Sequence, residues 1–325
     1  MPPRAGIDLG GTKIQAVLVD ESNDVLGSVR RPTPTSGGPA DVAREIELAL
    51  RDACAGERLD PSSLAGVGVG SPGTIENGNV SSARNLPGWE GSFPLAATLE
   101  AALGCKVRIG NDVQVATEAE FKLGAGEPYS SLLGVFWGTG VGGGLILDGR
   151  PWRGRGGAGE IGHVVVKLDG ARCTCGRIGC VEAYAGRAAM EARVRRQHEE
   201  KGRRTDLFKL MEEHNRTRLT SGIWARALEH GDTLASAAIE RAIRALGAGI
   251  ASVVNVLDVE SVVIGGGLGV RFGDPYAKRI AQEMQPHLFV DSRPPAVHVA
   301  ALGDLGGALG AALLVAEEGP PPAAG

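Results

Sequence analysis

Residues 132–147 read LLGVFWGTGVGGGLIL, and the plan of the whole chain can be worked out from this segment. Two apolar runs flank a Gly-Thr-Gly turn, the pattern of two β-strands joined by a glycine-containing hairpin. The same plan occurs earlier, in GIDLGGTKIQAVLV at residues 6–19. Two half-chains that begin with one module predict two related α/β lobes, with the active site in the cleft between them.

The segments after the first hairpin support an α/β organisation. We expect a third strand over residues 25–30, a helix over residues 41–53 and a buried strand over residues 64–71. In the helix, Val42, Ile46 and Leu50 recur at the spacing of one helical face. The first half therefore reads β-β-β-α-β. Further along, we expect helices over residues 181–197 and 233–256 and a last apolar helix over residues 306–316.

Both glycine turns have the chemistry of phosphate-binding turns. Glycines let backbone N–H groups approach phosphate oxygens, and the threonine adds a hydroxyl group. The first turn lacks the spacing of a Walker P-loop, and alone it could be an ordinary tight hairpin. Asp8 could hold Mg²⁺ through water. The predicted ATP-binding residues are Asp8, Gly10, Gly11, Thr12 and Lys13 in the first half and Gly138, Thr139 and Gly140 in the second.

Composition excludes several classes of function. The chain has 325 residues, is 43% hydrophobic and carries a formal net charge of -4, so it shows no basic footprint for nucleic acid. No apolar run reaches the roughly 20 residues that span a membrane, and the N-terminal residues do not read as a signal peptide. Five cysteines, three of them clustered, fit a reducing cytosol, so we expect a cytoplasmic protein without a membrane partner.

Three of the five cysteines lie within eight residues, in CTCGRIGCVE at residues 173–182, and GEIGH precedes them at residues 159–163. His163, Cys173, Cys175 and Cys180 form a complete tetrahedral ligand set for Zn²⁺. Four protein ligands leave no open position, so we interpret the site as structural and exclude a zinc hydrolase. The alternative is a group of free thiols beside an unrelated histidine, which this clustering disfavours.

A metal that fixes this loop would also fix the carboxylates beside it. Glu160 lies three residues before His163, and Glu182 lies two residues after Cys180. Carboxylates and the second nitrogen of the histidine suit the vicinal hydroxyl groups of a sugar. We therefore predict that Glu160, His163 and Glu182 bind a sugar.

A second polar pair follows the strand predicted at residues 107–110. Asn111 is suited to cap the helix after it, which would place Asp112 in the first helical turn, where the helix dipole favours a carboxylate. A first-turn aspartate is common and can be purely structural. It also suits a general base that accepts the proton of an attacking hydroxyl group.

Together these motifs resemble the ROK family of repressors and sugar kinases, over nearly the whole chain. The resemblance implies the two-lobed actin-like fold of hexokinases and assigns Asn111 and Asp112 to substrate binding, with Asp112 as the base. The run NLPGW at residues 85–89 is similar to the sugar loop of ROK glucokinases, which adds Asn85 to the substrate-binding residues. The glycine run at residues 262–269 matches the one beside adenosine, which adds Gly266 and Gly267 to the ATP site.

The resemblance also implies partners and boundaries. We expect residues 1–116 with 305–325 to form the N-terminal lobe and residues 117–304 to form the C-terminal lobe with the zinc loop. The last residues, 317–325, read as a disordered tail. ATP, Mg²⁺ and structural Zn²⁺ would be the cofactors, a hexose the substrate, and a homodimer or homotetramer the assembly.

The predicted reaction is phosphorylation of a hexose at its 6-hydroxyl group, with glucose as the favoured substrate. Alternatives within the family are a kinase for N-acetylmannosamine, mannose or fructose, or a glucokinase that uses polyphosphate. An alternative of another class is a sugar-sensing ROK regulator. Such regulators carry an N-terminal helix-turn-helix, and a first strand that starts at about residue 5 leaves no room for that domain.

Overall fold

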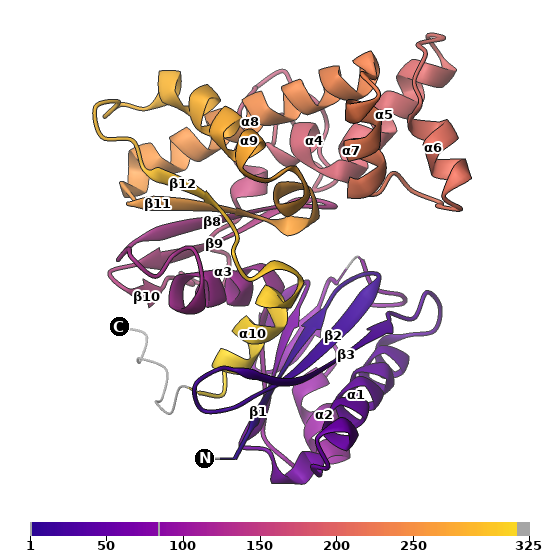
Figure 1. Cartoon of the computed structure of the whole chain (residues 1–325), viewed down its shortest axis with the longest axis vertical. Helices are drawn as coiled ribbons and strands as arrows, with labels where there is room; N and C mark the ends of the chain where they lie inside the picture. Colours follow the sequence, from indigo (N-terminus) through magenta and orange to yellow (C-terminus); the bar gives the residue numbers. More distant parts are fainter. Residues whose placement is uncertain (1, 84, 317–325) are drawn as a thin grey trace. The chain divides into compact units, whose positions relative to one another are not determined.

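The computed structural model describes residues 2–83 and 85–316, so the predicted disordered tail lies outside the described residues. The chain divides into two compact units (Figure 1). The first unit runs from the N-terminal end to Gly124 and resumes at Leu302, and the second is Ala125–Ala301. Among the described residues, no helix is long and apolar enough to cross a membrane.

The first unit is built on a five-stranded sheet of order β3-β2-β1-β4-β7. Its strands are β1 (Arg4–Leu9), β2 (Lys13–Val19), β3 (Val25–Pro32), β4 (Gly66–Ser71) and β7 (Val107–Asn111). β1, β2 and β3 are antiparallel, and β1, β4 and β7 are parallel. The predicted hairpin and the predicted order β-β-β-α-β are confirmed. A small hairpin pairs β5 (Thr74–Glu76) with β6 (Asn79–Ser81).

Helices complete this unit. They are α1 (Pro39–Gly56), α2 (Leu95–Leu103), α3 (Asp112–Leu123) and α10 (Gly306–Leu313), with short 3₁₀ turns at Pro61–Ser63 and Gly303–Leu305. Val42, Ile46 and Leu50 of α1 are all fully buried, as their spacing predicts. α2 was not expected from the sequence, although Leu95, Leu99 and Leu103 recur at helical spacing and are all buried.

The last helix among the described residues, α10, packs against β1 (Figure 1). Three glycines allow this close approach. A Cβ atom on Gly6 of β1 would lie 1.9 Å from the Ala308 carbonyl oxygen, and one on Gly68 of β4 would lie 1.7 Å from the Ala311 carbonyl oxygen. In α10, a Cβ on Gly310 would lie 1.9 Å from the Val115 carbonyl oxygen of α3. Backbone therefore packs directly on backbone, with no side chain between.

The second unit repeats the plan with a sheet of order β10-β9-β8-β11-β12. Its strands are β8 (Leu132–Trp137), β9 (Val141–Leu147), β10 (Arg150–Pro151), β11 (Ser261–Gly265) and β12 (Ala296–Val299). β8 and β9 form the predicted antiparallel hairpin, and β8 pairs in parallel with β11. The two units therefore share the directions of their first strands as well as the sequence pattern of their hairpins.

Six helices of the second unit follow in chain order. They are α4 (Glu182–Ala185), α5 (Arg187–Glu199), α6 (Leu207–Glu213), α7 (Ser221–Glu229), α8 (Thr233–Leu257) and α9 (Gly266–Met284), and 3₁₀ turns lie at Ile161–His163 and Gln285–His287. The long apolar helix expected over residues 233–256 is confirmed as α8. Its face with Ile239, Ile243, Leu246 and Ile250 is buried in the core of this unit.

The single helix expected over residues 181–197 is wrong. Gly186 breaks it into α4 and α5, because its backbone adopts φ -57° and ψ 130°, which is not helical. A Cβ on Gly186 would lie 2.9 Å from the Glu182 carbonyl oxygen and 3.4 Å from the Gly140 Cα. The break lets the chain pass close to the second glycine turn, a tertiary contact that helical periodicity does not contain.

Candidate active site and cysteine cluster

Three predicted site residues, Asp8 for the ATP site, Asn111 for the substrate and Asp112 for catalysis, lie at one edge of the first sheet. β1 pairs with β4 so that Asp8 is opposite Gly70, and β4 pairs with β7 so that Ser71 is opposite Asn111. Asp112 follows Asn111 directly and begins α3. Because carboxyl ends of parallel strands share an edge, the fold gathers these side chains at the edge where α/β sheets bind ligands.

Asn111 caps α3, as expected. Its Oδ1 atom accepts hydrogen bonds from the backbone N–H groups of Val113 and Gln114, both at 3.1 Å. The Asp112 carboxylate lies in the first turn, where its Oδ1 atom accepts from the Val113 N–H group at 2.9 Å. One oxygen of Asp112 is therefore held by the helix end.

The first glycine turn is narrow and braced. The Gly10 N–H group donates to the Lys13 carbonyl oxygen at 2.9 Å, and Thr33 Oγ1 donates to the Gly10 carbonyl oxygen at 2.6 Å. A Cβ on Gly11 would lie 3.0 Å from the Asn85 carbonyl oxygen. The structure thus brings Asn85, predicted from a separate motif, against this turn. Thr33 was not singled out from the sequence.

Asp304 is a further residue at this turn that the sequence did not reveal. Its carboxylate lies 2.9 Å from Arg30 Nη2 and 3.5 Å from Lys13 Nζ, and the hydrogen bond from Arg30 and the charge of Lys13 lower its pKa. Burial raises the pKa of Asp8, Lys13 opposes this rise and Asp304 adds to it. No sequence signal links residue 304 to β1, because only the return of the chain brings them together.

The second glycine turn meets the third glycine run within the second unit. The Gly138 N–H group donates to the Gly140 carbonyl oxygen at 3.0 Å. A Cβ on Gly266 would lie 2.6 Å from the Trp137 carbonyl oxygen, and one on Gly138 would lie 3.8 Å from the Gly267 nitrogen. Pairing of β8 with β11 therefore gathers the predicted ATP-binding glycines of this unit in one place.

Arg187 holds this turn from the start of α5. Its guanidinium donates to Thr139 Oγ1 at 2.7 Å and to the Leu219 carbonyl oxygen at 3.1 Å, and its backbone N–H group donates to the Gly138 carbonyl oxygen at 3.1 Å. A cavity of about 340 Å³ opens beside Thr139 and Arg187, with Glu191 and Arg195 of α5 also in its lining. Sequence reasoning missed Arg187, because nothing local relates it to Thr139.

Glu182 links the second turn to the cysteine segment. Its Oε2 atom accepts from the Val141 N–H group at 3.0 Å, and its Oε1 atom accepts from Thr174 Oγ1 at 3.1 Å. A Cβ on Gly140 would lie 2.3 Å from Oε2. The turn and the cysteine segment therefore share one carboxylate, whose position depends on both.

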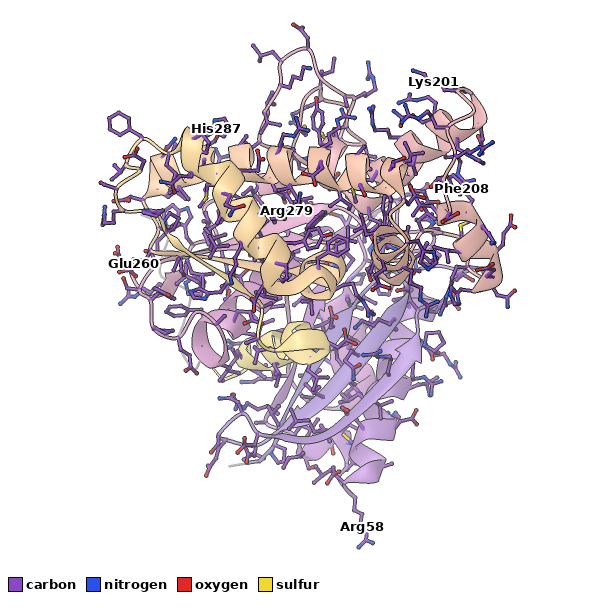
Figure 2. All side chains as sticks on the ribbon, turned by 45° about the horizontal axis from the view of Figure 1, so that its top comes forward. Arg58, Lys201, Phe208, Glu260, Arg279 and His287 are labelled. Atoms are coloured by element: carbon purple, nitrogen blue, oxygen red, sulfur yellow. The ribbon has the colours of Figure 1, made fainter. Side chains whose placement is uncertain are left out.

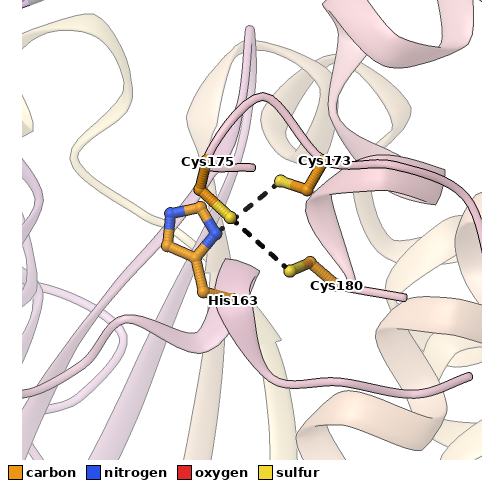
Figure 3. A group of neighbouring side chains, drawn as sticks. All are labelled: His163, Cys173, Cys175 and Cys180. Atoms are coloured by element: carbon orange, nitrogen blue, oxygen red, sulfur yellow. Dashed lines mark hydrogen bonds between the residues drawn. The ribbon is translucent and has the colours of Figure 1, made fainter. Parts of the chain in front are cut away.

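The predicted metal ligands converge, as Figure 3 shows. The ligand atoms of His163, Cys173, Cys175 and Cys180 all lie within 4.8 Å of one another. The Cys175 and Cys180 sulfur atoms are 3.8 Å apart, and Cys173 Sγ is 3.9 Å from His163 Nδ1. A tetrahedral site with Zn–S bonds of about 2.3 Å has sulfur–sulfur edges of about 3.8 Å, so the arrangement is compatible with zinc.

The thiol environments in this cluster differ. A hydrogen bond from the Arg177 N–H group lowers the pKa of Cys175 to about 6. Burial raises the pKa of Cys173 and raises that of Cys180 to about 12. One thiolate is thus favoured without a cation, and a metal ion would be needed to deprotonate the other two.

The imidazole of His163 faces two ways. Its Nδ1 atom points at the cysteine sulfurs, and its Nε2 atom lies 3.9 Å from Glu160 Oε2. Gly162 allows this placement, because a Cβ there would lie 1.9 Å from the Val141 carbonyl oxygen. Metal binding at Nδ1 would leave Nε2 and the exposed Glu160 carboxylate on the side away from the sulfurs.

Comparison with known proteins identifies the family. The model of the ROK family matches residues 4–318. The chain belongs to the ROK family. A glucokinase of Thermotoga maritima is 34% identical over 96% of this chain and 96% of its own length. An N-acetyl-D-glucosamine kinase of Citrobacter koseri is 30% identical over 95% of this chain and 98% of its own.

Solved ROK structures have the same fold. A ROK family glucokinase from Streptomyces griseus, crystallised with glucose and AMPPNP, superposes with a TM-score of 0.80 at 29% identity and covers 96% of this chain and 98% of that one. The predicted α/β fold of a ROK sugar kinase, similar to hexokinase, is therefore confirmed.

Proposed function

We propose that this ROK protein transfers the γ-phosphoryl group of ATP to the 6-hydroxyl group of a hexose, most favourably glucose, with Asp112 as general base. The observation that carries the proposal is the shared edge of the first sheet. There Asp8 of β1 and Asn111 of β7 lie at the carboxyl ends of parallel strands on either side of β4, Asp112 follows Asn111, and the Gly10–Lys13 turn follows β1. A carboxylate and a phosphate-type turn at one edge are the parts that phosphoryl transfer to a hydroxyl group needs.

The donor would be held by backbone groups and hydroxyls. Both glycine turns offer N–H groups, with Thr12 in the first unit and Thr139 in the second. The cavity beside Thr139 is large enough for the nucleoside end of ATP. Asp8 is suited to hold a water ligand of Mg²⁺, because a cation there would offset the cost of its burial.

The hexose would be bound through its hydroxyl groups. In the first unit the contacts are proposed for Asn85, Asn111 and Asp112. In the second unit they are proposed for Glu160, His163 and Glu182, with the ring nitrogen of His163 that faces Glu160 as the polar contact. A sugar is recognised by such convergent polar groups because each satisfied hydroxyl adds discrimination.

Zinc would have a structural role in this proposal. Cys173, Cys175, Cys180 and Nδ1 of His163 fill four positions, so the ion orders the loop and leaves no open position. The chemistry then belongs to Asp112. Its carboxylate accepts the proton of the 6-hydroxyl group as that oxygen bonds to the γ-phosphorus, and the bond to the ADP oxygen breaks.

The test is a coupled assay for ADP with MgATP and a panel of hexoses, run on the wild type and on Asp112→Asn. We expect glucose to give the highest kcat/KM and the variant to lose about 10²–10⁴-fold in kcat with an unchanged fold. Asp41→Asn is the matched control, because Asp41 is also a first-turn aspartate. Retention of most of the wild-type kcat in Asp112→Asn would exclude this residue as the base.

A second substrate has a specific observation in its favour. The N-acetyl-D-glucosamine kinase of Citrobacter koseri is nearly as similar to this chain as the glucokinases are. The hexose panel should therefore include N-acetylglucosamine, N-acetylmannosamine, mannose and fructose, and a polyphosphate donor should replace ATP in a parallel series. The sugar and the donor with the highest kcat/KM identify the activity.

A further inference from the structure

Several arginines on this protein are neutralised by carboxylates. Arg31 is paired with Glu45 and Asp52, and Arg279 of α9, labelled in Figure 2, is paired with Glu240. With a formal net charge of -4, the chain has carboxylates to spare for such pairs. In the described part of the chain, other arginines have no such partner, and one group of them is fixed in place by a further contact.

Arg193 and Arg196 of α5 and Arg241 of α8 form such a group, here called the arginine cluster. Arg193 and Arg196 are three residues apart, so they lie on one face of α5, and α5 packs against α8. Among the residues that the structure describes, none of the three takes part in an ion pair. Arg193 and Arg241 are half-buried, so water screens their charges only in part.

The cluster is held in place by an aromatic ring. The Arg241 guanidinium lies over the Tyr184 ring at 4.3 Å from its centroid, a cation–π contact. The Tyr184 hydroxyl accepts a hydrogen bond at 2.9 Å from the N–H group of Ala171, two residues before Cys173. Tyr184 of α4 therefore holds the Arg241 guanidinium in place and also bonds to the loop that leads into the cysteine cluster.

The ligand-free cluster is under electrostatic strain. Burial lowers the pKa of Arg193, and the neighbouring charges of Arg241 and Arg196 lower it further. Like charges without a counter-charge destabilise a fold, and an anion bound between these arginines would remove that cost.

The cluster is separate from the proposed ATP site. Arg187, Glu191 and Arg195 line the cavity beside Thr139 and share another face of α5. Successive residues of a helix are about 100° apart, so Arg195 lies about 200° around the axis from Arg193. Arg195 is also engaged elsewhere, because it bonds to Glu191 and lies over the Phe208 ring at 4.7 Å from its centroid.

We propose that Arg193, Arg196 and Arg241 form a second anion site, which binds the phosphate group of a small molecule. The planar guanidinium forks match phosphate oxygens in bidentate pairs, and the cluster contains arginine alone, without lysine. Two sources share this chemistry: inorganic phosphate or a short oligophosphate, and a hexose phosphate.

Titration calorimetry on the intact protein tests the site, with inorganic phosphate, tripolyphosphate and glucose 6-phosphate as separate probes. We expect at least one probe to saturate the wild type and to bind at least 10-fold more weakly to the double variant Arg193→Gln/Arg241→Gln. Arg44→Gln is the control, because Arg44 is an exposed arginine of α1 outside the cluster and outside the lining of the cavity beside Thr139. The probe that binds most tightly identifies the source.

The measurement needs no turnover, and any binding of a probe at the proposed hexose or ATP site would be equal in the wild type and the double variant. Slower hydrogen exchange in the peptides of α5 and α8 on binding would locate the ligand at the cluster. Equal affinities of the wild type and the double variant for every probe would overturn the proposal, as would the absence of saturable binding by all three.

A second variant checks the electrostatic premise without any ligand. Arg196 is exposed, so Arg196→Gln should fold normally and should raise the Tm of the ligand-free protein by relieving repulsion. Addition of the phosphate probe should then reduce the difference in Tm between this variant and the wild type, because binding stabilises the wild type more. A lower ligand-free Tm for Arg196→Gln would contradict the premise.

Discussion

Replacing Gly140 by alanine would place a methyl carbon 2.3 Å from Oε2 of Glu182. A carbon and an oxygen atom in contact are about 3.3 Å apart, so the carboxylate must move by about 1 Å. The movement breaks its 3.0 Å hydrogen bond from the Val141 N–H group. The end of a glutamate side chain can move at a cost of about 1–3 kcal/mol, the value of one hydrogen bond to a charged group, so the fold survives.

Activity should change far more than stability. A displacement of about 1 Å in a group that positions a substrate can cost about 100-fold, which corresponds to about 2.7 kcal/mol of transition-state stabilisation. We therefore expect kcat/KM for the hexose to fall by about 100-fold in Gly140→Ala, and the KM for ATP to change much less. Steady-state kinetics with each substrate varied in turn separates the two effects.

The same turn supplies the control. The Cβ of Gly138→Ala would fit without a clash, because its nearest neighbour, the Gly267 nitrogen, would be 3.8 Å away. Neither Gly138 nor Gly140 has a positive φ, so alanine strains the backbone at neither position. Gly138→Ala should therefore leave the KM for the hexose at the wild-type value. If Gly140→Ala also kept wild-type hexose kinetics, Glu182 could not be a sugar-binding residue, and the proposed role of this carboxylate would be wrong.

Three further predictions concern stability and metal binding. Gly68→Ala should destabilise the first unit by about 3 kcal/mol or more, because its Cβ meets the backbone of α10 at 1.7 Å; Gly56→Ala, at the open end of α1, should stabilise by about 0.5–1 kcal/mol. Denaturant unfolding with hydrogen exchange on β4 peptides measures both, and similar effects of the two variants would contradict the packing described. The raised pKa of Asp8 means that its ionised form is disfavoured in the fold, so this residue's contribution to stability is largest below its unfolded pKa of about 3.9 and falls as pH rises. Asp8→Asn should accordingly raise the Tm at pH 7 while lowering activity. The gain in Tm should disappear in thermal scans near pH 3. A lower Tm for Asp8→Asn at pH 7 would show that the ionised carboxylate does not destabilise the fold. Cys175→Ala should lose bound zinc in elemental analysis and raise the KM for the hexose more than that for ATP, whereas Cys105→Ala, a thiol outside the cluster, should do neither. An unchanged hexose KM in zinc-free Cys175→Ala would separate the metal from the sugar.

The sequence was informative where a contact is local or where a pattern repeats. The two hairpins follow from the apolar runs around their glycine turns, and the Asn111 cap follows from one residue before a helix. The convergence of His163 with three cysteines was predictable as well, because four metal-ligating residues within 18 positions have few other uses.

Contacts between distant segments were not predictable. Nothing near Arg187 indicates that its guanidinium bonds to Thr139, and nothing near Asp304 indicates a partner in Lys13. The break at Gly186 depends on the approach of Gly140, which belongs to another element. Periodicity describes which face of a helix is apolar, and it contains no information on which backbone comes within van der Waals distance.

The position of α10 has a consequence for synthesis on the ribosome. β1 and β4 emerge early, but the helix that covers them comes about 180 residues after α3. At a translation rate of about 5–20 residues per second, the roughly 235 residues between β4 and α10 take about 12 to 47 s, during which the glycine-lined surface on these strands has no partner. The second unit is continuous in sequence and can complete itself first. The nascent first unit is therefore the part of this protein with most need of a chaperone.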